Sequence, residues 1–167
     1  MLLTSALAYG MLAGSSGVAS GQATLTATAT LAASASVATT QLDFATITPG
    51  VTKTIAPQAG LPDGIAGTAT VTFNTSSVTV AVPASMTLTG PGATMLATLA
   101  CAWAPSSGAT STTPFTCTTG QVFTNASASL GQGYVYVGGS IVAAESTAKP
   151  AGVYNGAVTV TASYPAS

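Results

Sequence analysis

Residues 23–37 read Ala-Thr-Leu-Thr-Ala-Thr-Ala-Thr-Leu-Ala-Ala-Ser-Ala-Ser-Val, and every odd-numbered position in this stretch is apolar. The even-numbered positions are mostly Thr and Ser. Because successive side chains of a strand point to opposite faces, the pattern predicts a strand with one apolar and one hydroxyl-rich face. Fifteen extended residues span roughly 50 Å, whereas an average strand has about 5–6 residues.

The unusual length of this stretch allows two interpretations. The stretch is either a long, bent first strand within its own sheet, or part of it leaves its domain and pairs with another copy. The second interpretation makes the chain a polymer subunit. The pattern alone favours the first, because internal strands are far more common than donated ones.

The chain of 167 residues is long enough for one domain with a sizeable core, but it is almost uncharged. Charged residues make up 3% of it, against about 25% in an ordinary domain. They are Asp43, Lys53, Asp63, Glu145 and Lys149. Such a surface does little to oppose self-association, and two lysines cannot form a patch that binds nucleic acid. The composition suits an assembled extracellular protein.

The first residues are small and apolar, as in the hydrophobic region of a secretory leader. Val18-Ala19-Ser20 offers a small-residue cleavage site, although no basic residue precedes Lys53. We interpret residues 1–22 as a signal or leader segment, residues 23–38 as an N-terminal extension, and residues 39–167 as a β-sandwich domain.

The remainder of the chain alternates short apolar rows with turn-forming residues. Thr68–Phe73, Val78–Val82, Met95–Trp103 and Ala157–Tyr164 are predicted strands, separated by Gly- and Pro-containing segments. Many short strands with frequent turns indicate an all-β sandwich or barrel. No stretch has a helical period supported by capping residues.

Cys101 and Cys117 are the only cysteines and enclose fifteen residues. In an exported chain two cysteines most often form a disulfide. A metal site would need further ligands, and the chain has no His. A nucleophilic cysteine would need a base, and none is evident, so we predict a Cys101–Cys117 disulfide.

Catalysis has little support in the sequence. The three carboxylates are far apart in the chain, and Asp63 in Pro62-Asp63-Gly64 is typical of a turn. We therefore expect no enzymatic activity, no cofactor and no metal site. Asn74 and Asn125 begin N-glycosylation acceptor patterns, which matter only if the source organism glycosylates secreted proteins.

Three segments carry a resemblance to a known family. Residues 41–50 (QLDFATITPG), residues 150–156 (PAGVYNG) and residues 157–164 (AVTVTASY) are similar to the early "LDFG.I.PG" segment and the closing "G.Y.G...VTV.Y" strand of one family. The family is a group of bacterial secreted domains allied to the spore-coat-U-like and archaic chaperone–usher pilins. The likeness extends over about Thr24–Tyr164, with Ala45 standing where the family often has Gly.

The resemblance implies an immunoglobulin-like, pilin-like sandwich that lacks one strand and is completed by the N-terminal extension of a neighbouring copy. The groove-filling residues would be Leu25, Ala27, Ala29, Leu31 and Ala33. The groove-flanking residues would be Tyr154, Val158, Val160 and Tyr164. The chain would then be a structural subunit of an extracellular filament or pilus that serves surface attachment or biofilm. Its partners would be identical subunits and, before assembly, a periplasmic chaperone and an outer-membrane usher.

The alternative is a secreted β-sandwich that does not polymerise and acts as an adhesion or glycan-binding module. Carbohydrate sites usually expose aromatic rings, and the candidates are Trp103, Tyr134 and Tyr136. Trp103 lies two residues from Cys101, which favours a place in the core.

Overall fold

A computed structural model describes residues 33–125 and 130–164 of the chain. The expected leader and four expected groove-filling residues, Leu25, Ala27, Ala29 and Leu31, lie outside the described residues. The described residues form strands and one four-residue helix, α1 (Ala143–Ser146). The prediction of an all-β fold is therefore confirmed.

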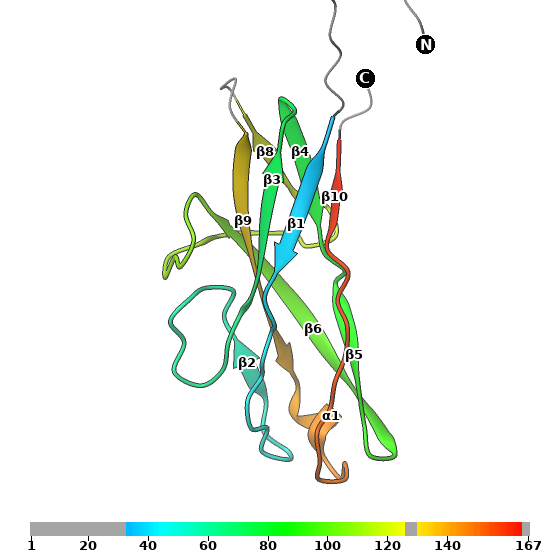
Figure 1. The fold of residues 1–167 in the computed structure, drawn as a ribbon. Coiled ribbons are helices and arrows are strands. Elements are labelled where there is room, and N and C mark those ends of the chain that lie inside the picture. The colour runs from blue at the N-terminus through cyan, green and yellow to red at the C-terminus, as the bar shows by residue number, and fades with distance from the viewer. Residues whose placement is uncertain (1–32, 126–129, 165–167) are drawn as a thin grey trace, which may run out of the picture. The chain divides into compact units, whose positions relative to one another are not determined.

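The larger sheet is antiparallel, in the order β1-β3-β9-β6-β5 (Figure 1). Its strands are β1 (Ala35–Thr39), β3 (Gly67–Phe73), β9 (Gly131–Ile141), β6 (Ala93–Ala104) and β5 (Ser85–Gly90). Two short strands extend it: β2 (Lys53–Ile55) pairs with β9, and β7 (Thr113–Phe115) pairs with β6.

The smaller sheet has the order β10-β4-β8 and is also antiparallel. It consists of β10 (Thr161–Ser163), β4 (Ser77–Ala81) and β8 (Gln121–Thr124). The predicted strand Ala157–Tyr164 is wrong in extent, since only its residues 161–163 are in a ladder. Residues 157–160 alternate between exposed and half-buried like a strand but belong to none.

The two sheets enclose one apolar cluster between them. Val71 and Val135 of the larger sheet and Val78 and Val80 of the smaller sheet are fully buried in it. A second cluster, which includes Phe44, lies toward the α1 end and is covered by loops and the C-terminal segment. The fold is thus a β-sandwich whose second layer covers only part of the larger sheet.

The strand β1 is the edge of the larger sheet, and it pairs in register with β3. Val37 lies opposite Val71 and packs against the core. The N-terminal extension, expected over residues 23–38, therefore ends before Ala35, because residues 35–38 are already held by the β3 ladder.

The predicted disulfide is present and joins Cys101 of β6 to Cys117, with the two sulfurs 2.08 Å apart. Cys117 also accepts a hydrogen bond at its carbonyl oxygen from the N–H of Val82 (2.9 Å). The disulfide therefore anchors the long loop before β8 to β6 of the larger sheet.

Replacing both cysteines by alanine is expected to lower the free energy of unfolding by about 3 kcal/mol, because the unfolded chain regains the freedom of the closed loop. Urea unfolding of the double variant measures the loss. Wild-type protein unfolded under reducing conditions is the control and should approach the same value. A loss below about 0.5 kcal/mol would show that the bond does not constrain the unfolded chain as this model assumes.

Candidate binding groove

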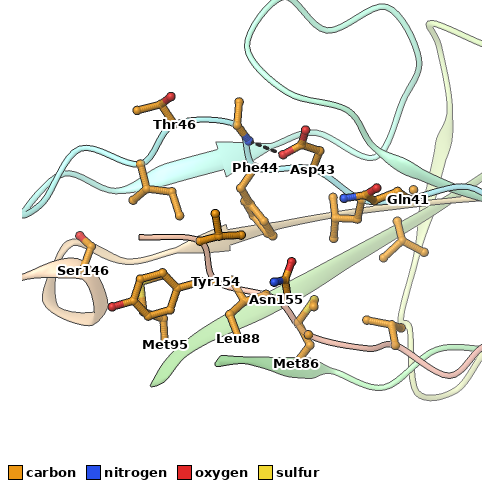
Figure 2. A pocket seen from close by; sticks show the side chains of 18 of the residues that line it. Gln41, Asp43, Phe44, Thr46, Met86, Leu88, Met95, Ser146, Tyr154 and Asn155 are labelled. Carbon is orange, nitrogen blue, oxygen red and sulfur yellow. Dashed lines mark hydrogen bonds between the residues drawn. The ribbon is translucent and has the colours of Figure 1, made fainter. Parts of the chain in front are cut away.

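A groove of about 760 Å³ runs along one edge of the domain, between two segments from opposite ends of the described chain. One wall is the continuation of β1, residues 39–47, and the other is the C-terminal segment, residues 149–160. Figure 2 shows Phe44 extending into the groove from the first wall, with Tyr154, Leu88 and Met86 on the other side.

The first wall is fixed by backbone pairing that continues beyond β1. The N–H of Thr40 donates to the carbonyl of Thr68 (2.8 Å), and Asp43 and Ile65 exchange two hydrogen bonds of 2.8 Å each. The wall therefore keeps the β1–β3 register as far as Asp43. Leu42 packs against the core, and Phe44 is buried in it.

A tight turn follows Phe44. The Asp43 carboxylate accepts a hydrogen bond from the N–H of Ala45 at 2.8 Å, and Ala45 has a positive φ of 52°. Left-handed backbone is unfavourable for alanine and freely adopted by glycine. This conformation gives a physical reason for glycine at this position in the "LDFG.I.PG" pattern.

Replacing Ala45 by glycine is expected to raise the free energy of unfolding by about 0.5–1 kcal/mol. Relief of the left-handed alanine gains roughly 1–2 kcal/mol, and the greater freedom of glycine in the unfolded chain offsets part of this gain. Chemical denaturation measures the change. Ala38→Gly, in the exposed part of β1, is the matched control and should lower the stability, whereas equal losses in both variants would contradict this account.

The second wall crosses from one sheet to the other. Asn155 exchanges hydrogen bonds with Thr89 of β5 (2.7 and 3.0 Å), and Thr161 begins the ladder with β4. Between these two points, residues 156–160 have no ladder partner among the described residues. Of these residues, Gly156, Val158 and Val160 line the groove, and neither sheet pairs with their backbone.

The ring of Tyr154 is held at this wall by close packing. A Cβ at Gly90 would lie 2.5 Å from the ring, so glycine is needed there for Tyr154 to lie flat against β5. The Tyr154 hydroxyl donates to the carbonyl of Pro150 at 2.8 Å. These contacts fix the position of the aromatic ring on this side of the groove.

The floor is apolar and comes from strands of the larger sheet. Its side chains are those of Ala69, Met86, Leu88, Met95 and Val137. Of these, all except Met86 are buried. The floor and walls together favour binding of an extended apolar segment whose backbone can hydrogen-bond along one wall of the groove.

The expected groove-flanking residues fall into two groups. Tyr154, Val158 and Val160 line the groove, and both valines are half-buried. Tyr164 follows β10, is 38% exposed and is not a lining residue. Ala33, the last expected groove-filling residue, is exposed just ahead of β1. The wall at residues 39–47 and the floor were not predicted from the sequence. The apolar pair Leu42 and Phe44, in a segment rich in turn residues, was the one indication of that wall.

Two of the five charged residues, Asp43 and Lys149, line the groove. Asp43 serves the turn at Ala45, and Glu145 accepts a hydrogen bond from the N–H of Leu96 at 2.9 Å. Within residues 33–125 and 130–164 no three potential metal-ligating side chains come together.

The three candidate aromatic residues for glycan binding are buried or half-buried. Tyr136 is 1% exposed, and its hydroxyl accepts from the N–H of Ala109 at 2.9 Å. Trp103 is half-buried and packs edge-on against Phe123, with ring centroids 6.1 Å apart. Tyr134 is half-buried and donates its hydroxyl to Gln132 at 2.6 Å. The three rings form no shared exposed platform.

Comparison of the chain with protein-family models, curated proteins and solved structures gave no significant match. In the described part of the chain, no helix is long and apolar enough to cross a membrane.

Proposed function

We propose that the groove receives an extended strand from the N-terminal extension of a neighbouring copy, and that the chain is a structural subunit of a secreted filament. The observation that carries this proposal is the groove itself. It lies between two edge segments, it has an apolar floor, and one wall offers backbone that no described strand uses.

The residues before β1 have the pattern that such a groove would select. Leu25, Ala27, Ala29, Leu31 and Ala33 form one apolar row of five side chains that spans nine positions of the sequence. Burial of each leucine should contribute roughly 1.5–3 kcal/mol. The alanines permit close approach of the backbone, as in peptide recognition by strand addition.

The register of the guest strand follows from its two unlike faces. A shift by one residue would turn the threonine row toward Leu88 and Met95 and expose both leucines. The resemblance of residues 41–50 and 150–164 to archaic chaperone–usher pilins adds support from the sequence. It also suggests a periplasmic chaperone and an outer-membrane usher as assembly partners, and surface attachment or biofilm as the role.

The alternative, a non-polymerising adhesion or glycan-binding module, has less support. It would draw on exposed aromatic rings, and of the three candidates Tyr136 is buried while Trp103 and Tyr134 are half-buried. The uncharged, groove-bearing domain is better accounted for by self-assembly.

A synthetic peptide of residues 23–34 tests the proposal directly. The receiver is the full chain carrying Leu31→Asp, whose own extension is disabled. At about a hundredfold excess over Kd, the bound peptide should stabilise the receiver by about 2.7 kcal/mol and raise its Tm by about 5–10 °C.

The control peptide has the same composition but exchanges Leu25 with Thr26 and Leu31 with Thr30, which places both leucines on the other face. It should leave the Tm unchanged. Equal stabilisation by both peptides, or by neither, would contradict strand addition at the groove.

A further inference from the structure

The end of the larger sheet where β1 begins holds the root of the N-terminal extension firmly. The N–H of Ser34 donates to the side-chain oxygen of Asn74 at 2.7 Å, and the N–H of Asn74 donates to the carbonyl of Ser34 at 3.2 Å. Leu130 precedes β9 at the same end and is 65% exposed. We call this end the arm pole, defined by Ser34, Asn74 and Leu130.

The opposite end of the domain carries loops whose residues line one end of the groove. The loops at residues 45–51 and 146–153 meet there, and the N–H of Gly50 donates to the Ser146 hydroxyl at 3.1 Å (Figure 1). Val51 follows Gly50 and is 54% exposed. We call this end the mouth pole, defined by Gly50, Val51 and Ser146.

Growth of a filament requires that the neighbour's strand enters at the mouth pole. If the strand entered at the arm pole, two copies would face each other by the same surface and close into a pair. A head-to-tail contact uses two different surfaces and can repeat without limit. In a filament, the extension therefore leaves one copy at its arm pole and enters the next copy at its mouth pole.

The length of chain between the seated strand and its own domain is very short. Entry at the mouth pole places Leu31 and Ala33 at the mouth-pole end of the groove, and the Asn74 contacts hold Ser34. Three residue steps from Leu31 to Ser34 span at most about 11 Å. Loops and side chains on both ends fill such a gap, so the two poles must touch.

We infer that the arm pole of one copy packs against the mouth pole of the next, with Leu130 and Val51 as apolar members of an interface between copies. The inference rests on the proposed function and adds a second contact surface to the donated strand. The Ser34–Asn74 contacts hold the chain at the arm pole. The contact should therefore make the filament stiff.

The test compares filaments of full-length Val51→Asp and Leu130→Asp with wild type and with Thr98→Asp. Neither Val51 nor Leu130 lines the groove, and Thr98 is an exposed residue within β6 that belongs to neither pole. A charge facing an apolar surface without a partner is unfavourable, so the persistence length measured by electron microscopy should fall by about half or more in both pole variants. Thr98→Asp should match wild type.

Binding of the residue 23–34 peptide to each variant, in the Leu31→Asp background, distinguishes a failure of the pole contact from a failure of the proposed function. Retained binding with flexible or absent filaments supports the pole contact. Retained binding with filaments as stiff as those of Thr98→Asp overturns it. Loss of peptide binding in the parent Leu31→Asp protein overturns the proposed function, and the pole contact with it.

Discussion

If the chain assembles by strand donation as proposed, Leu31→Asp is expected to abolish its sedimentable filaments. In the proposed donated strand, Leu31 would enter the part of the groove that Phe44, Leu88 and Met95 line, where a carboxylate would lose its hydration against apolar side chains. The variant loses the roughly 1.5–3 kcal/mol of leucine burial and must also desolvate a charge. The secreted protein should remain folded, because Leu31 precedes β1 and its ladder.

Thr30→Asp is the matched control for Leu31→Asp. It introduces the same charge one residue away, on the face that points out of the groove, and should assemble nearly as well as wild type. Sedimentation of secreted protein, followed by microscopy of the pellet, measures both variants. Normal filaments from Leu31→Asp, or equal loss in both variants, would mean that the extension belongs to its own domain.

Val158→Asp is expected to have a comparably large effect from the side of the receiving groove. Val158 lines the groove and is half-buried, so a carboxylate at this position reaches water in the free subunit. A seated strand would cover that carboxylate and leave it without a partner. Stability of the free subunit should fall modestly, while filament formation should be lost.

Thr159→Asp places the same charge on the opposite, exposed face of the segment and should assemble normally. Thermal unfolding of both variants shows whether the subunit is intact, and mixing each with wild type shows whether it can still donate its extension. If Val158→Asp is folded and forms filaments as Thr159→Asp does, residues 156–160 do not border the seated strand.

The all-β architecture could be predicted because apolar and polar residues alternate along a strand that buries one of its faces. The row Met95–Trp103 lies within β6, and Thr68–Phe73 lies within β3. The same alternation over residues 157–160 did not produce a strand. Alternation reports which side chains are buried, and it says nothing about whether the backbone has a neighbour to pair with.

Part of the groove's lining lies in a segment that the resemblance singles out. Tyr154, Val158 and Val160 line the groove, and the entry of a strand between its walls stays a prediction. The other wall depends on the pairing of Asp43 with Ile65, which is a contact between residues distant in sequence. The turn at Ala45 depends on a backbone conformation that alanine does not indicate.

Photo-cross-linking from position 31 of the extension tests the central claim most directly. The peptide of residues 23–34, with photo-leucine in place of Leu31, is irradiated with the full-length Leu31→Asp protein, and mass spectrometry locates the attachment. We predict attachment within residues 44–49, 86–95 or 149–156, suppressed by excess unlabelled peptide. Attachment scattered over other surfaces, or unaffected by the competitor, would contradict a strand-accepting groove.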